Sequence, residues 1–193
     1  IHPKTGELFV SDGYGNSRIH KFDPDGQHMM SWGEPGTDPG QFSLPHNISM
    51  LGLDKVVVAD RENFRLQIFT TGGDFVEQIH IHHPMSVTQG KGDDDNLYVG
   101  EMIPPPVQQG VRNLGAMIAV LSSEGDYQQH LGGPLPGEGV SQFTAPHGVS
   151  TDSHGSVYVA EVAWTNYFSN PDNSGMETPP LGEVVSLRKW RRS

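Results

Sequence analysis

The stretch Lys55-Val-Val-Val-Ala-Asp60 is a short β-branched run that ends in a small residue and a carboxylate. Runs of the same kind occupy residues 7–12 (Glu-Leu-Phe-Val-Ser-Asp), 96–101 (Asn-Leu-Tyr-Val-Gly-Glu) and 156–161 (Ser-Val-Tyr-Val-Ala-Glu). Their acidic ends stand at positions 12, 60, 101 and 161, which are 48, 41 and 60 residues apart. A strand-like segment that returns at such intervals is typical of a repeat protein.

Each run is followed by further strand-like segments, and almost nothing in the chain has the apolar spacing of a helix. Second strands are expected at residues 18–22, 65–69, 116–121 and 183–187, and glycine-bearing hairpin turns at 23–26, 70–73 and 122–125. Strand, hairpin and strand at this period predict the blades of a β-propeller. A plain sandwich or barrel is the alternative, but unrelated strands would not repeat the terminal acid. We therefore expect one all-β domain of four repeats, at about 1–38, 39–82, 83–138 and 139–193.

The composition narrows the range of partners. The 193 residues suffice for one sizeable core, and no apolar run approaches the ~20 residues that a membrane helix needs. The formal net charge is −11, and basic residues cluster only at positions 188–192, which argues against nucleic-acid binding. The absence of cysteine excludes disulfides and thiolate metal ligands but indicates no compartment. A small-molecule or peptide substrate is the partner class that remains, with self-association expected if the chain is only part of a propeller.

The motif Gln-Phe-x-x-Pro-His occurs twice, ending at His46 and at His147. The intervening repeat has His83-Pro-Met85, where Met85 takes the histidine's place. Because equivalent positions of different blades converge on the central channel of a propeller, His46 and His147 are candidate ligands of Zn²⁺ or a similar ion. A third ligand has to come from elsewhere. The alternative is that Pro-His only begins a strand, with the imidazole packed under a loop. The remaining histidines are expected mostly to face solvent. The tract at 80–83 resembles a ligand tract, but strand alternation would point His80 and His82 to the same side of a peripheral strand.

Two turns carry further candidate residues. In Ser11-Asp-Gly-Tyr-Gly-Asn-Ser-Arg18, two glycines flank Tyr14 in a tight turn that would present the phenol at the channel mouth. The matching turn of the next repeat contains Arg61, which is placed to clamp a carboxylate. The alternatives are a tyrosine that covers the blade edge, and an arginine that pairs with Asp60 or Glu62.

At these residues the sequence resembles peptidyl-α-hydroxyglycine α-amidating lyase, the lyase domain of peptidylglycine α-amidating enzymes, and its bacterial NHL-repeat relatives. The likeness runs from about residue 1 to 69 and returns around 146–159. It is strongest at residues 10–18, 39–46 and 58–63. That family is a six-bladed propeller, so the resemblance implies an all-β, NHL-type β-propeller. About four of the six blades would be present, with the N-terminal blades missing.

The resemblance also implies site residues. His46 and His147 would be two of three zinc ligands, Tyr14 the catalytic tyrosine, and Arg61 one of two active-site arginines. The implied activity is that of a carbon–nitrogen lyase, which cleaves an N–CH(OH)–COOH unit to an amide and glyoxylate. Zn²⁺ would make the hydroxyl more acidic and Tyr14 would take its proton.

Departures from the family pattern also carry expectations. Gly148 replaces an aspartate that serves a structural calcium, which puts a calcium site in doubt, and Gly15 replaces a cysteine, so the family's disulfide is absent. Loops at 104–114 and 164–181 look inserted, and such loops are where substrate specificity changes. The alternative function is therefore a non-catalytic NHL-repeat scaffold that binds a protein or peptide. A lactonase-like calcium enzyme is disfavoured, because the candidate ligands are histidines.

Overall fold

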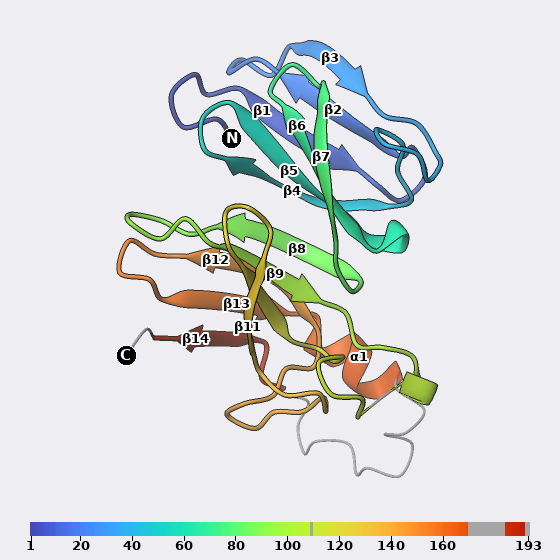
Figure 1. The fold of residues 1–193 in the computed structure, drawn as a ribbon, viewed down its shortest axis with the longest axis vertical. Helices are drawn as coiled ribbons and strands as arrows, with labels where there is room; N and C mark the ends of the chain where they lie inside the picture. The colour runs from blue at the N-terminus through green and yellow to red at the C-terminus, as the bar shows by residue number, and fades with distance from the viewer. Residues whose placement is uncertain (109, 170–183, 192–193) are drawn as a thin grey trace. The chain divides into compact units, whose positions relative to one another are not determined.

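The computed structural model describes residues 1–108, 110–169 and 184–191, and the regular secondary structure of these residues is almost entirely β (Figure 1). The exceptions are one short helix, α1 (Ala163–Ser169), and two 3₁₀ turns, η1 (Arg61–Asn63) and η2 (Pro106–Gln108). The strands are β1 (Leu8–Asp12), β2 (Arg18–Phe22), β3 (His28–Trp32), β4 (Pro45–Leu51), β5 (Lys55–Asp60), β6 (Arg65–Thr70), β7 (Phe75–His80), β8 (Pro84–Gln89), β9 (Leu97–Glu101), β10 (Ile118–Leu121), β11 (Tyr127–Leu131), β12 (Pro146–Thr151), β13 (Val157–Glu161) and β14 (Leu187–Trp190). The predicted all-β class is confirmed.

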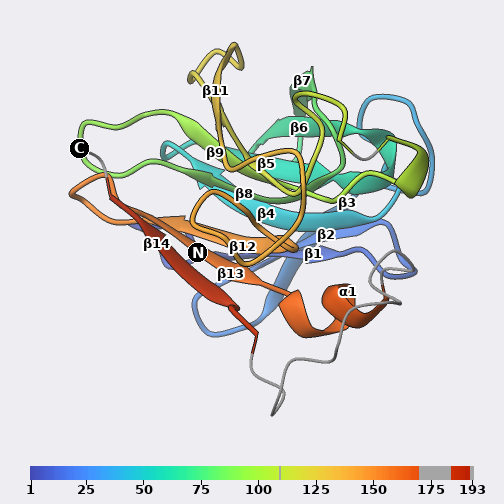
Figure 2. The ribbon, with the colours of Figure 1, turned by 90° about the horizontal axis from the view of Figure 1, so that it is seen from below.

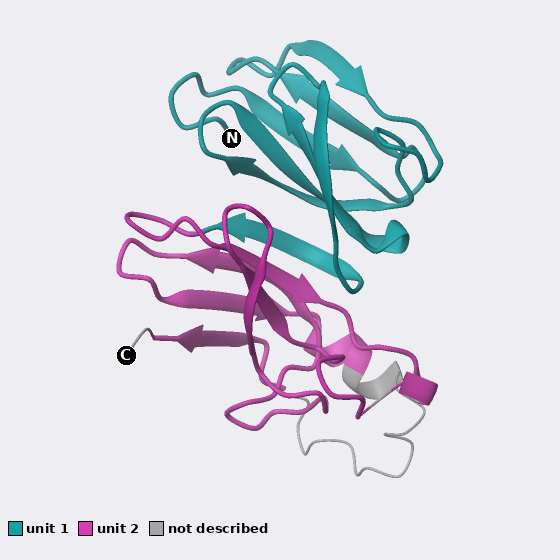
Figure 3. Ribbon diagram, viewed as in Figure 1, with its two compact units in different colours: residues 1–89 teal, residues 90–193 magenta. Residues whose placement is uncertain are grey.

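The strands form four sheets in which sequence neighbours are also neighbours in space. Their orders are β1-β2-β3, β4-β5-β6-β7, β8-β9-β10-β11 and β12-β13-β14 (Figures 1 and 2). Each sheet falls within one of the four expected repeats, as blades built of antiparallel hairpins do. The chain divides into two compact units, residues 1–89 and 90–193, which are described separately (Figure 3).

The repeated runs are buried because they form the middle of the sheets. The four hydrophobic residues of β5, Val56 to Ala59, have no exposed surface, and Val56 and Val58 join a cluster that includes Phe9, Ile19, Phe42 and Phe69. In the second unit, Phe143 occupies a similar place among residues of β10 and β13. The phenylalanine of each Gln-Phe-x-x-Pro-His motif is therefore a core residue, which fixes the segment that leads to the histidine.

The repeated acid holds the same segment by hydrogen bonds. Asp60 accepts from the backbone N–H of Ser43 and from Arg65 Nε, both at 2.8 Å. Glu161 accepts from the backbone N–H groups of Thr144 and Ala145 and from Arg188 Nε. Because Asp60 and Glu161 are buried, losing the arginine would leave an uncompensated charge. The acid that revealed the repeat is thus a structural residue in both blades.

Two expectations about the fourth repeat were wrong. Its second strand, β14, is Leu187–Trp190 rather than 183–187, because Arg188 pairs with Glu161 and the Trp190 ring stacks on Phe143 at 5.7 Å. The segment expected as a loop at 164–181 begins with helix α1, in which the side-chain amide of Asn166 donates to the carbonyl of Val162. The rest of that loop, residues 170–183, lies outside the described residues. Within the described part of the chain, no helix has the length and apolarity needed to cross a membrane.

The acid of the third repeat, Glu101, has a different partner. It is buried and accepts a hydrogen bond from His130 Nε2 at 3.1 Å. Burial raises the pKa of the Glu101 carboxyl above its ordinary value of 4.5, and the hydrogen bond and charge of His130 only partly oppose this. The folded-state pKa therefore lies above the unfolded one. The stabilisation from Glu101 is complete below pH 4.5 and is lost as the pH rises through the folded-state pKa.

We accordingly expect Glu101→Gln to gain stability relative to the parent protein as the pH rises from about 4.5 to 7. Urea unfolding at several pH values would measure the difference in the free energy of unfolding. A difference that stays constant, or that shrinks with rising pH, would contradict this account of Glu101.

Candidate functional site

The two motif histidines occupy equivalent irregularities at the start of a strand. In β4, Pro45 pairs with Asp60 and Asn47 with Ala59, so His46 is an extra residue between them. In β12, Pro146 pairs with Glu161 and Gly148 with Ala160, which leaves His147 in the same position. Such a bulge turns the side chain of the extra residue away from the regular alternation. Both imidazoles are half-buried.

The ring of His46 has a defined orientation. Its Nδ1 lies 2.6 Å from the carbonyl oxygen of Met85 in β8. Since a carbonyl only accepts, Nδ1 carries the hydrogen and Nε2 presents a lone pair. A backbone carbonyl on one nitrogen is the usual support for a histidine whose other nitrogen binds a metal. Next to it, the Asn47 side-chain oxygen accepts from the backbone N–H of Val87 at 3.0 Å, which holds β4 against β8.

Tyr14 extends from the turn between β1 and β2 toward that lone pair. Its hydroxyl lies 3.1 Å from His46 Nε2, and because Nε2 is the acceptor, the phenol donates. Tyr14 as a whole remains 78% exposed. The preceding Gly13 packs tightly: a Cβ there would lie 2.5 Å from the carbonyl oxygen of Pro45, so only glycine lets the turn approach the start of β4 this closely.

Arg61, at the start of η1, also contacts Tyr14. Its Nη1 is 3.4 Å from the Tyr14 hydroxyl, and the guanidinium carbon is 5.8 Å from the centre of the phenol ring. Its Nε donates to Glu62 at 2.8 Å. Of the two ion pairs considered for Arg61 from the sequence, the one with Glu62 is therefore present. Asp60 instead forms its ion pair with Arg65. Pairing with Glu62 does not remove Arg61 from Tyr14, because different nitrogens make the two contacts.

Glu62 connects the site to His83, a residue that the sequence did not predict for it. Its second carboxylate oxygen accepts from His83 Nε2 at 3.1 Å. Burial raises the pKa of Glu62, but the hydrogen bonds and charges of Arg61 and His83 outweigh it, so the pKa lies below 4.5. His83 was expected to face solvent, and this was wrong: its side chain is only 17% exposed.

The structure thus brings together Tyr14, His46 and Arg61, all in residues 1–89. His147 belongs to the other unit, and its convergence with His46 stays a prediction. The described residues contain no group of three His, Asp or Glu side chains placed to hold a metal ion. The Nε2 lone pair of His46 accepts from Tyr14 here, and it is the group that would bind a zinc ion in place of that hydrogen bond. Met85 orients His46 through its backbone carbonyl, a role that could not be predicted from the type of its side chain.

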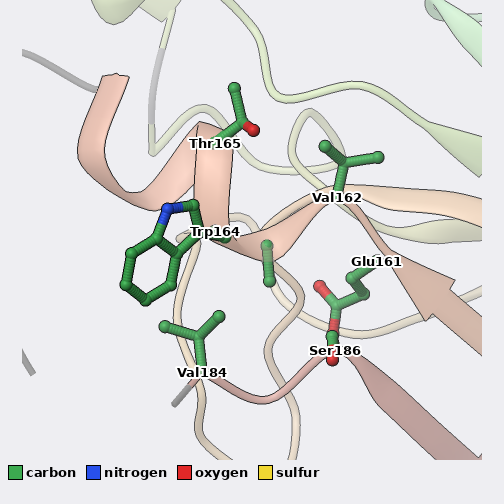
Figure 4. Close-up of a pocket in the computed structure, with 7 residues that line it drawn as sticks. Glu161, Val162, Trp164, Thr165, Val184 and Ser186 are labelled. Carbon is green, nitrogen blue, oxygen red and sulfur yellow. The ribbon is translucent and has the colours of Figure 1, made fainter. Parts of the chain in front are cut away.

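A separate pocket lies in residues 90–193, at the end of β13. It has a volume of about 510 Å³ and is lined by Glu161, Val162, Ala163, Trp164, Thr165, Val184 and Ser186 (Figure 4). Its one carboxylate, Glu161, already binds two backbone N–H groups and Arg188. Among the described residues, the lining therefore offers no titratable group that is available for chemistry.

Comparisons with known proteins agree with the repeat pattern. The NHL repeat family matches residues 42–69. Peptidyl-glycine alpha-amidating monooxygenase B of Xenopus laevis is 34% identical over 176 residues, which are 83% of this chain and 18% of that protein. Peptidyl-alpha-hydroxyglycine alpha-amidating lyase 2 of Drosophila melanogaster is 30% identical over 186 residues, 86% of this chain and 39% of that protein. Peptidylglycine alpha-amidating monooxygenase of Rattus norvegicus is 48% identical over 85 residues, 41% of this chain and 9% of that protein.

Solved structures resemble the chain at lower identity. Virginiamycin B lyase from Staphylococcus aureus has a TM-score of 0.58 at 17% identity, covering 82% of this chain and 46% of that one. Kuenenia stuttgartiensis hydrazine synthase has a TM-score of 0.60 at 12% identity, covering 83% of this chain and 40% of that one. At these identities the likeness concerns the fold alone. Together with the four sheets and the NHL match, it confirms a β-propeller of NHL-type repeats. The chain spans less than half the length of each of these proteins.

Proposed function

We propose that this chain, which belongs to the family of the peptidyl-α-hydroxyglycine α-amidating lyases and their NHL-repeat relatives, carries part of the active site of a zinc-dependent lyase. The substrate class is an N-acyl-α-hydroxyglycine, in a peptide or a smaller molecule. The products are an amide and glyoxylate. One observation carries the proposal: the guanidinium of Arg61, from η1, and the Nε2 of His46, from the start of β4, both meet the hydroxyl of Tyr14, from the turn between β1 and β2.

The reaction is a proton removal coupled to bond cleavage. The hydroxyl of the N–CH(OH)–COO⁻ unit loses its proton, its electron pair forms the aldehyde of glyoxylate, and the C–N bond breaks. The nitrogen leaves as an amide and takes up a proton. In its phenolate form, Tyr14 is the group placed to accept the hydroxyl proton, because its side chain is exposed and its oxygen lies 3.4 Å from the guanidinium of Arg61, which stabilises negative charge there.

Arg61 also suits the substrate's carboxylate. Its Nε is occupied by Glu62, but the guanidinium edge has further donors in the fork geometry that matches a carboxylate. His46 and His147 would hold the zinc, and His46 already has the tautomer that a ligand needs. When bound, zinc supplies Lewis acidity that makes the substrate hydroxyl easier to deprotonate. The absence of a carboxylate at Gly148 leaves no comparable proposal for calcium.

The test is glyoxylate release from N-benzoyl-α-hydroxyglycine by the purified full-length protein with its metal content measured. We expect turnover that stops after treatment with a chelator and returns with Zn²⁺. A folded, zinc-loaded protein that releases no glyoxylate above the uncatalysed rate would contradict the lyase proposal and favour the alternative, a scaffold that binds a protein or peptide.

A further inference from the structure

The Glu62 carboxylate links Arg61 to His83. One oxygen accepts from Arg61 Nε at 2.8 Å and the other accepts from His83 Nε2 at 3.1 Å. The contacts continue from Arg61 to the Tyr14 hydroxyl and from there to His46. Arg61 is therefore held at one nitrogen by Glu62 while its Nη1 faces the phenol.

This arrangement contributes little to stability by itself. Arg61 and Glu62 are adjacent in sequence, and the Glu62 side chain is 38% exposed. Such partly exposed pairs contribute little to the stability of a fold, because water screens the charges and two side chains lose freedom. A purely structural purpose thus explains the link poorly, whereas the orientation of Arg61 depends on it directly.

His83 adopts its place at a conformational cost. Its φ is +30° and that of Phe64 is +54°, a region that residues other than glycine seldom occupy. The two rings stack, with centroids 4.4 Å apart and planes 10° apart. The Nδ1 of His83 is buried without a hydrogen-bond partner, so the ring's polar contact is directed through Nε2 at Glu62. Backbone strain and an unsatisfied buried atom are features that functional sites retain.

From this geometry we propose that Glu62 and His83 are positioning residues that fix the Arg61 guanidinium for binding the carboxylate of the substrate. The inference rests on the proposed function for its substrate class. The His83 N–H donor occupies the second oxygen of Glu62. That oxygen therefore cannot turn toward Nη1 and Nη2 of Arg61 and compete there with a substrate carboxylate.

The experiment compares two substitutions at His83 in the full-length protein. His83→Phe keeps a flat ring against Phe64 but removes the N–H donor, whereas His83→Gln replaces the donor with an amide at a similar distance along the side chain. The first readout is the dissociation constant of N-acetylglycine, an unreactive carboxylate probe, by calorimetry. The second is KM and kcat for N-benzoyl-α-hydroxyglycine, and thermal unfolding reports on the fold.

We expect His83→Phe to weaken N-acetylglycine binding and raise KM by about 10-fold, as supporting contacts around a site commonly do, with a smaller change in kcat. His83→Gln should restore much of the binding. Glu62→Gln, which removes the charge but keeps an acceptor, should lie between them. In a protein already carrying Arg61→Gln, adding His83→Phe should change the binding no further, because the effect passes through Arg61.

Several results would overturn the proposal. Equal losses in His83→Phe and His83→Gln, or an additive loss in the Arg61→Gln background, would show that His83 acts only through packing. Binding of N-acetylglycine that is unchanged in His83→Phe would also contradict it, as would no binding by the parent protein. Failure of the proposed function is a separate outcome, because absence of glyoxylate release leaves the N-acetylglycine comparison intact.

Discussion

Replacing both motif histidines, as His46→Ala with His147→Ala, is expected to remove zinc from the full-length protein and to lower kcat/KM for N-benzoyl-α-hydroxyglycine by at least about 10³-fold. A metal that polarises the reacting oxygen contributes several kcal/mol to the transition state, and each 1.4 kcal/mol or so is a factor of ten. Both residues sit at bulges, half-buried, where their truncation leaves the strand pairing in place. Elemental analysis of the purified protein, beside steady-state kinetics, measures both effects.

The control for this variant is His154→Ala. His154 lies exposed in the turn before β13, and its backbone N–H donates to Asp152. It should keep the parent's zinc content and activity. If the double variant kept its zinc and its rate, both histidines would be packing residues at the start of their strands, which is the alternative weighed from the sequence.

The features predicted well from the sequence are those that the backbone repeats. The acid at 12, 60, 101 and 161 recurs because, in the second and fourth repeats, it ties the motif segment to the blade. The phenylalanine of Gln-Phe-x-x-Pro-His recurs because it fills the core. Since these residues have the same structural role in successive blades, their spacing alone predicted the β-propeller blades and placed both histidines at the start of a strand.

The features that were missed depend on contacts that cannot be predicted from the types of the residues that make them. Met85 supports His46 through a carbonyl that any residue would have. His83 belongs to the site through Glu62, a contact across 21 positions of sequence that no repeat spacing encodes. The strand at 183–187 was misplaced because Val184 and Val185 suit a strand by composition. The actual register follows Arg188, whose partner Glu161 can be identified only by analogy with Arg65 and Asp60.

Tyr14→Phe should separate proton transfer from metal binding. The substitution removes one exposed oxygen and nothing from the core, so we expect zinc content and thermal stability close to those of the parent. If Tyr14 takes the hydroxyl proton, kcat should fall by roughly 10²–10⁴-fold, the usual contribution of a general base, with a smaller change in KM. Single-turnover glyoxylate release under saturating substrate measures this step.

Tyr127→Phe is a matched control for that variant. Tyr127 is also an exposed tyrosine, 54% accessible, whose hydroxyl contacts a histidine nitrogen, His130 Nδ1, at 3.0 Å. It lies on β11, away from Tyr14 in the chain and outside the group formed by Tyr14, His46 and Arg61. Loss of a tyrosine–histidine hydrogen bond is thus common to both variants, and only Tyr14→Phe should lose the reaction. An equal effect of the two substitutions, or full activity in Tyr14→Phe, would assign Tyr14 to covering the blade edge and leave the base to be sought on another residue.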